Sequence, residues 1–311
     1  MTLPAASQAD DAKALAALEK AGRLFEAHSR LAKENVLNRW KDARRYEENP
    51  SLPFVLPAPL FFGDRMFVDL REIVSQTLYA FGSFEHALSA FFFRALRPGD
   101  VFFDVGAHIG YFSLLARHRV GSDGMVVSFE PMPQTALLLQ RNVERFSNIH
   151  IVRKAVWHEV GRVTMNDFGE AHSPFSSVSP IRLPEKSFSK ISAQRTLDVE
   201  AVTLDAVARA RGVTPHYVKI DAESAELSVL RGMNSLLSGR RPVVAVEVGD
   251  YQHLIDRGVP ASRDTLRHLS GHDYALFEPT MQTLRPHNPR DGFYEYGNIV
   301  CIPKERVNDY L

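Results

Sequence analysis

Cysteine, net charge and long apolar runs are scarce in this chain of 311 residues. The one cysteine, Cys301, excludes a disulfide within the chain, which fits a reducing compartment. The 37 acidic residues balance the 37 basic residues, so overall charge favours neither nucleic acid nor an anionic membrane as a partner. No apolar run reaches the length that spans a bilayer, and the N-terminus lacks the pattern of a secretory signal. We therefore expect a cytoplasmic protein without nucleic-acid or membrane partners.

Residues 1–59 are predicted to form an extension that precedes the main domain. Apolar and small side chains recur every three or four residues between about 9 and 46, which predicts one or two amphipathic helices. Gly22 and Ser29 interrupt this stripe, so we expect it to pack on the main domain or on the same helix of a second subunit, as a homodimer. Prolines between 49 and 59 remove backbone donors and predict a break in regular structure.

Residues 60–311 alternate predicted strands with predicted helices, a pattern typical of a parallel sheet with helices on both faces. Ser83 is placed to cap a helix over 84–96, just before the first central strand. Seven strands are predicted, the last of them as an antiparallel edge, near 101–105, 125–130, 149–153, 216–221, 242–248, 273–278 and 293–302. The predicted fold class is therefore α/β, with a doubly wound, mostly parallel sheet.

A glycine turn follows the first central strand and predicts a ligand site. Gly106 and Gly110 bracket the turn, where backbone N–H groups at the start of a helix can face a ligand. Asp104 stands where a dinucleotide-binding fold has its first glycine, and its carboxylate would repel a pyrophosphate but accept hydrogen bonds from an ammonium group or a ribose. Glu130 ends the next strand, in position to take both ribose hydroxyls. Taken singly, Asp104 is better explained as a helix cap or turn residue and Glu130 as a solvated strand end. Taken together, they predict a nucleoside cofactor such as S-adenosylmethionine.

A second charged motif follows the predicted strand near 216–221. Lys219 and Asp221 share one face of that strand and lie toward its carboxyl end, where open α/β sheets hold their ligands. Ser224 could cap the next helix, with Glu226 in its first turn. Capping explains these two residues, but a lysine in an otherwise apolar strand needs a charged partner.

Several motifs occur in a fixed order between about 80 and 303. They are Gly82-Ser83-Phe84-Glu85, the run from Asp104 to Tyr111, Phe129-Glu130-Pro131, Asn142, Lys154-Ala155-Val156, Thr203-Leu204-Asp205, the run from Lys219 to Glu226, and Val246-Glu247-Val248. In this order the chain resembles the FkbM family of S-adenosylmethionine-dependent methyltransferases. The resemblance implies a class I, Rossmann-like methyltransferase fold and O-methylation of hydroxyls on sugars, glycans or secondary metabolites. The chain departs from the family pattern at His108, where Asn is usual, and at Ser224, where Gly is usual.

The resemblance also implies the positions that hold the cofactor. It places Glu85 beside the aminoacyl portion, Asp104 and Gly106 beneath it, and Glu130 on the ribose. His108 can donate a hydrogen bond to the cofactor carboxylate in place of the usual Asn. The implied cofactor-binding residues are Glu85, Asp104, Gly106, His108, Gly110, Glu130, Ala155 and Val156, the last two against the adenine.

Methyl transfer to an aliphatic hydroxyl calls for a general base or a metal, because the hydroxyl is a poor nucleophile. Asp221 is the predicted base, with Glu223 as the next candidate and Lys219 as the group that holds Asp221 ionised. His172 and His216 are weaker candidates, since lone histidines are more often structural. We predict no metal; the alternative is a divalent cation held by the carboxylates of Asp221, Glu223, Glu247 and Asp250.

Residues 166–195 lack periodicity and are predicted to form a loop on the acceptor side of the site. Its aromatic and hydroxyl side chains suit a small-molecule or carbohydrate acceptor. Two further functions stay open at this point. One is an NAD-dependent oxidoreductase, against which Asp104 speaks; the other is a catalytically silent binding or assembly protein with the same fold.

Overall fold

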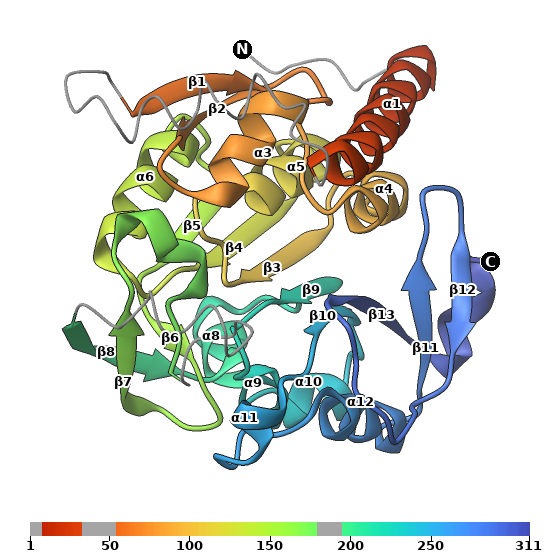
Figure 1. Cartoon of the computed structure of the whole chain (residues 1–311). Coiled ribbons are helices and arrows are strands. Elements are labelled where there is room, and N and C mark those ends of the chain that lie inside the picture. The colour runs from red at the N-terminus through yellow and green to blue at the C-terminus, as the bar shows by residue number, and fades with distance from the viewer. Residues whose placement is uncertain (1–7, 33–53, 179–194) are drawn as a thin grey trace.

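The computed structural model describes residues 8–32, 54–178 and 195–311. The main sheet consists of β3 (Val101–Val105), β4 (Met125–Phe129), β5 (Ile149–Val152), β9 (Tyr217–Ile220), β10 (Val243–Val248), β11 (Tyr274–Pro279), β12 (Leu284–His287) and β13 (Gly297–Pro303). Its spatial order is β12-β11-β13-β10-β9-β3-β4-β5 (Figure 1). The five strands from β10 to β5 pair in parallel, and β13, β11 and β12 pair antiparallel.

Helices cover both faces of this sheet because its central strands are apolar on both sides. The adjacent residues Phe102 and Phe103 are both fully buried but belong to two different cores, as the alternation of a strand requires. The Phe102 core includes side chains of α3 (Ile73–Phe81), α4 (His86–Ala95), α5 (Tyr111–Val120) and α6 (Pro133–Val143). The Phe103 core includes side chains of α8 (Leu204–Arg211), α9 (Glu226–Arg231), α10 (Asn234–Ser238) and α12 (Ser262–Gly271), while α11 (Gln252–Ile255) follows β10. This arrangement confirms the predicted doubly wound α/β class.

The position of the last strand in the sheet differs from the prediction. β13 is antiparallel, as expected, but it lies between β10 and β11 and is not an edge. The edge is β12, an eighth strand that was not predicted and that returns from β11 through a turn in which Thr280 N donates to Thr283 O. Only four residues long, with Pro286 inside it and two exposed side chains, β12 shows too little alternation to be recognised from sequence.

Two smaller sheets flank the main one. The first pairs β1 (Val55–Pro59) with β2 (Arg65–Asp69), and the second has the order β6-β8-β7, from β6 (Ala155–Val156), β7 (Gly161–Asp167) and β8 (Arg195–Val202). The predicted break in regular structure over 49–59 is therefore wrong from Val55 onward. Pro57 and Pro59 are tolerated because a two-stranded sheet leaves one side of each strand unpaired.

The predicted loop 166–195 is partly regular. β7 extends to Asp167, and a 3-10 helix, η1 (Glu170–Phe175), follows it. A second such helix, η2 (Lys304–Asp309), follows β13. Residues 179–194 of the predicted loop lie outside the described residues.

The N-terminal helix α1 (Gln8–Ala32) packs against α4 and α3 of its own chain (Figure 1). Leu18 is fully buried there, and the Phe25 ring meets the Phe81 ring edge-on at 5.6 Å between centroids. The expectation of packing on the main domain is met for this part, whereas residues 33–46 lie outside the described ranges. A homodimer through this helix stays a prediction. Within the described residues, none of the helices combines the length and apolar character needed to cross a membrane.

Candidate active site

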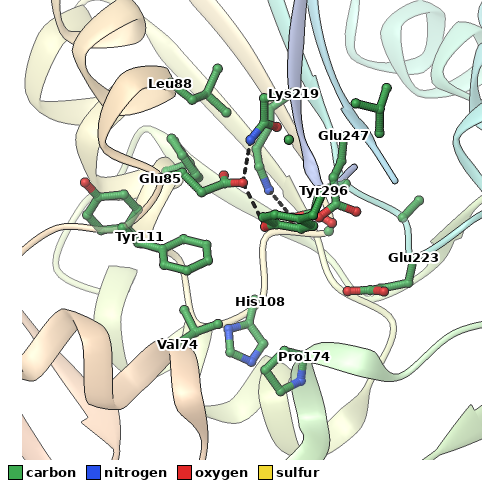
Figure 2. Close-up of a pocket in the computed structure, with 18 of the residues that line it drawn as sticks. Val74, Glu85, Leu88, His108, Tyr111, Pro174, Lys219, Glu223, Glu247 and Tyr296 are labelled. Carbon is green, nitrogen blue, oxygen red and sulfur yellow. Dashed lines mark hydrogen bonds and ion pairs between the residues drawn. The ribbon is translucent and has the colours of Figure 1, made fainter. Parts of the chain in front are cut away.

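A cavity of about 960 Å³ lies where β3, β4, β9 and β10 end (Figure 2). Its volume is at the upper end of the range of about 300–1,000 Å³ found for small-molecule sites. The predicted residues that line it are Glu85, Gly106, His108, Glu130, Ala155, Val156, Lys219, Asp221 and Glu223. Asp104 and Gly110 are not part of its wall. The structure thus brings together most of the predicted site, from segments far apart in the sequence.

The glycine turn after β3 has the left-handed backbone that its sequence suggests. The φ angles are 72° at Gly106, 50° at His108 and 96° at Gly110. A Cβ atom on Gly106 would lie 1.8 Å from the carbonyl oxygen of Asp221, so only glycine lets the turn approach the end of β9 this closely. The turn therefore sets the spacing between the ends of β3 and β9 at the cavity.

Glu130 ties the glycine turn to the start of α6. Its Oε2 accepts a hydrogen bond from His108 N at 3.0 Å, and its Oε1 accepts one from Met132 N at 2.9 Å. Burial raises the pKa of Glu130 to about 8, against the opposing effect of these two N–H donors. Each carboxylate oxygen has further lone pairs, so Glu130 can still accept ribose hydroxyls from the cavity.

Asp104 is buried in β3 just before the glycine turn and is hydrogen-bonded to α5. It is fully buried, and its Oδ2 accepts a hydrogen bond from the Ser113 hydroxyl at 2.6 Å, which in turn lies 2.7 Å from the Ser128 hydroxyl. Burial raises the pKa of Asp104, although Lys219 opposes the shift. Asp104 is not part of the cavity wall, so a direct hydrogen bond from its carboxylate to an ammonium group or ribose does not fit, and its place beneath the cofactor stays a prediction.

Lys219 has the charged partner that its apolar strand requires. Its Nζ donates to Asp221 Oδ2 at 2.9 Å, and the two strands place it in register with Asp104. Burial lowers the pKa of Lys219, but the charges of Asp221, Asp104 and Glu85 outweigh burial and raise it. Lys219 is therefore an ammonium group that neutralises part of a carboxylate cluster, and it cannot serve as a base.

Glu85 occupies a left-handed position, with φ 44°, just before α4. Ser83 was predicted to cap this helix, but its hydroxyl instead lies 3.5 Å from the carbonyl of Phe81. Glu85 Oε1 accepts hydrogen bonds from the Tyr296 hydroxyl and from Asn298 Nδ2 (Figure 2). Glu85 Oε2 is buried and has no hydrogen-bond partner among the residues that the structure describes. Burial raises the pKa of Glu85, so a cationic donor at Oε2 would relieve an unfavourable state.

The carboxylates of Asp221, Glu223 and Glu247 converge, each offering an oxygen within 4.8 Å of the others. Glu223 and Ser224 both have positive φ, which turns the chain sharply after β9. Ser224 is therefore not the cap of α9; the Glu226 carboxylate accepts the N–H groups of Ala222 and Ser224 instead.

Asp250 does not lie with the other three carboxylates of the alternative metal site. Asp250 accepts hydrogen bonds from Ser262 and from Tyr294 N, which directs its carboxylate to another part of the fold. Lys219 already donates to Asp221, so the three remaining acids face an ammonium group. The absence of a metal stays a prediction.

Of the remaining candidate residues, some line the cavity and one lies far from it. Ala155 and Val156 form β6 and are buried in the cavity wall. His216 lies at the opposite end of the strands, where its Nδ1 accepts from Val101 N, so it has no place in this site. The side chain of His172 lies outside the described part. Its neighbour Ser173 lines the cavity, with its Oγ 3.2 Å from His108 Nε2.

Sequence reasoning missed Tyr296 and Asn298. They precede and begin β13, which reaches the cavity only because it inserts beside β10. The signal was the polar and aromatic run from Glu295 to Asn298 before an apolar strand. Nothing local to that run indicates that it meets Glu85, more than 200 residues away in sequence.

Comparisons with known proteins point to one family. Residues 104–276 match the family described as the methyltransferase FkbM domain. The hexuronic acid methyltransferase AglP of Haloferax volcanii is 28% identical over 153 residues, which cover 48% of this chain and 57% of that protein. The 31-O-demethyl-FK506 methyltransferase FkbM of Streptomyces tacrolimicus is 31% identical over 177 residues, which cover 50% of this chain and 67% of that protein. The chain thus spans little more than half the length of the first of these relatives.

A solved structure was also matched. The methyltransferase FkbM from Methylobacillus flagellatus has 20% sequence identity and a TM-score of 0.43, with 75% of this chain and 56% of that chain covered.

Proposed function

Because this chain belongs to the FkbM methyltransferase family, whose cofactor is S-adenosylmethionine, we propose that it is an O-methyltransferase. The acceptor we propose is a hydroxyl of a sugar, glycan or secondary metabolite. One relative is named for hexuronic acid and the other for 31-O-demethyl-FK506, which supports acceptors of these kinds. The observation that carries the proposal is the cavity in which an ion-paired Asp221 lies beside the glycine turn.

The cavity has the charge and the acceptors that suit a cationic nucleoside. Glu85 Oε2 is a buried acceptor that lacks a donor among the described residues, and it suits the ammonium group of the cofactor. Glu130 lies in the wall beside the turn and suits the ribose hydroxyls. When bound, the cofactor supplies a methyl group already activated on a sulfonium. The residues of the chain therefore have to orient the acceptor, exclude water and move one proton.

Asp221 is the proposed general base. Lys219 Nζ donates to its Oδ2, which fixes the carboxylate and leaves Oδ1 to accept the proton of the acceptor hydroxyl. Asp221 Oδ1 would take the hydroxyl proton as the acceptor oxygen bonds to the methyl group that S-adenosylmethionine would supply, with S-adenosylhomocysteine as the leaving group. Glu223 converges on the same point and is the second candidate for the base.

The direct test measures methyl transfer to a panel of hexuronides, neutral pyranosides and macrolide alcohols, by mass spectrometry of the products. Asp221→Asn is expected to lower kcat by about 10²–10⁴, the usual contribution of a general base, while affinity for S-adenosylhomocysteine is retained. Glu223→Gln is the matched variant and is expected to lose less. Undiminished transfer by Asp221→Asn would remove the proposed base. A wild-type protein that binds NAD but not S-adenosylhomocysteine would contradict the function as a whole.

A further inference from the structure

Tyr296 presents an open aromatic face to the cavity. It lines the cavity wall and 61% of its surface is exposed, so most of the residue stays open to contact by a ligand (Figure 2). Aromatic faces in concave sites are common binding surfaces because they combine a large apolar area with few rotatable bonds. The reaction proposed above gives this ring no role.

The hydroxyl of Tyr296 holds that ring in place. It donates to Glu85 Oε1 at 3.0 Å, and Glu85 also accepts from Asn298. The phenol also lies near the carboxylates of Glu247 and Asp221. A ring tethered at its far end loses little freedom when a ligand lies on it.

The strand order places this ring away from the Glu130 side of the cavity. β13 is antiparallel to β10, with Gly297 opposite Val248, so Tyr296 lies at the edge where β10 ends. The order β13-β10-β9-β3-β4 then puts Tyr296 and Glu130 on opposite sides of Asp221. With the ribose and adenine expected on the Glu130 side, the Tyr296 side is left for the acceptor.

We propose that the Tyr296 ring is the platform on which the acceptor stacks, and that the acceptor carries a saturated ring with hydroxyls, as a pyranose does. This proposal rests on the proposed methyltransferase function. The face of an aromatic ring is negatively polarised and attracts the C–H groups on one face of a pyranose. A sugar ring stacked there has Asp221 beside it for the reacting hydroxyl, with Glu223 and Glu247 within reach of others.

The experiment uses the full chain saturated with S-adenosylhomocysteine and measures ligand binding by saturation-transfer NMR. The probes are methyl β-D-glucopyranoside and methyl β-D-glucuronide, with sorbitol as an open-chain polyol that lacks a ring face. Tyr296→Leu removes the aromatic face, and Tyr296→Phe keeps it but removes the bond to Glu85. Phe293→Leu is the matched control, because Phe293 is 53% exposed but does not line the cavity.

We expect Tyr296→Leu to weaken binding of the two pyranosides about ten-fold, the effect of one aromatic contact. Phe293→Leu should stay within about three-fold of wild type. Tyr296→Phe should lose less than Tyr296→Leu, because it keeps the ring and loses only the tether to Glu85, and sorbitol should respond to none of the variants. Unchanged pyranoside binding by Tyr296→Leu, equal losses in Tyr296→Phe, or a wild type that binds S-adenosylhomocysteine but neither pyranoside would each overturn the platform alone. Failure of the wild type to bind S-adenosylhomocysteine would overturn the methyltransferase proposal together with it.

Discussion

Lys219 and Asp221 form an ion pair at the floor of the cavity, with 2.9 Å between Nζ and Oδ2. The lysine side chain is only 4% exposed and also lies 5.0 Å from the centre of the Phe112 ring. Glu85 and Asp104 add their charges to that of Asp221. One ammonium group therefore serves several carboxylates, and Glu85 Oε2, away from that ammonium group's hydrogen bond to Asp221, is left to accept a hydrogen bond from a ligand cation.

Removal of Lys219 should destabilise the fold as well as the site. Lys219→Met leaves buried carboxylates without a cation, and we expect a loss of about 3 kcal/mol in the free energy of unfolding, measured with urea. The double variant Lys219→Met with Asp221→Asn should recover part of this loss, because one unpaired charge is removed as well.

The matched control for this ion pair is on the surface. Lys304 and Asp273 form an exposed pair at 3.1 Å, and Lys304→Met should cost less than about 1 kcal/mol. If Lys219→Met were as stable as Lys304→Met, the ion pair would not have the role given to it.

Gly106→Ala should disrupt the contact between the turn and β9. The new methyl group would meet the backbone oxygen of Asp221 at 1.8 Å, so the backbone must move in addition to adopting an unfavourable positive φ. We expect loss of S-adenosylhomocysteine binding by calorimetry and a marked fall in the melting temperature.

Gly63→Ala is the control that separates backbone strain at positive φ from a steric clash of the added methyl group. Gly63 also has positive φ, at 88°, but its added methyl group would have no atom within 4 Å. This variant should lose only about 1–2 kcal/mol of stability from backbone strain and should keep its affinity for S-adenosylhomocysteine. Equal behaviour of the two variants would show that the close approach to Asp221 is unimportant.

Glu130 predicts a pH dependence of stability in the cofactor-free protein. Its pKa is raised from 4.5 to about 8, so the folded state holds a proton that the unfolded state releases between these values. The stabilisation from this group is fully present below about pH 4.5 and is lost as pH rises toward 8. The melting temperature should accordingly fall less steeply between pH 5 and 8 in Glu130→Gln than in wild type, by several degrees. Glu144→Gln, at an exposed site, should keep the wild-type slope; equal slopes in all three proteins would argue against the shift.

We expect methyl transfer to continue after removal of divalent cations. The ammonium group of Lys219 donates to Asp221 and would repel a cation bound by the same carboxylate cluster. Turnover after dialysis against EDTA should match that of untreated protein, whether or not Mg²⁺ is added back. Loss of activity in EDTA with recovery in Mg²⁺ would instead assign Asp221, Glu223 and Glu247 to a metal.

The sequence predicted the parts of the site that are local to one strand end. Gly106 and Glu130 were recognisable because a turn residue and a strand-terminal acid have fixed places relative to a parallel sheet. Lys219 was recognisable because a charge in an apolar strand demands a partner.

Other features depend on long-range pairing and could not be predicted. Asp104 belongs to a strand buried on both faces, so the sequence does not say which face its carboxylate takes. Tyr296 reaches Glu85 only through the insertion of β13 beside β10, which no local pattern encodes. The cap expected from Ser224 failed because Glu226 satisfies the same backbone donors from within the helix.

The most direct test of the account is a crystal structure of the protein with S-adenosylhomocysteine. We predict the ribose hydroxyls at the Glu130 carboxylate, the ammonium group at Glu85 Oε2, and the sulfur directed toward Asp221 and the Tyr296 side of the cavity. A ligand bound elsewhere, or a cavity that stays empty at saturating ligand with Glu85 and Glu130 turned away from it, would contradict the central claim.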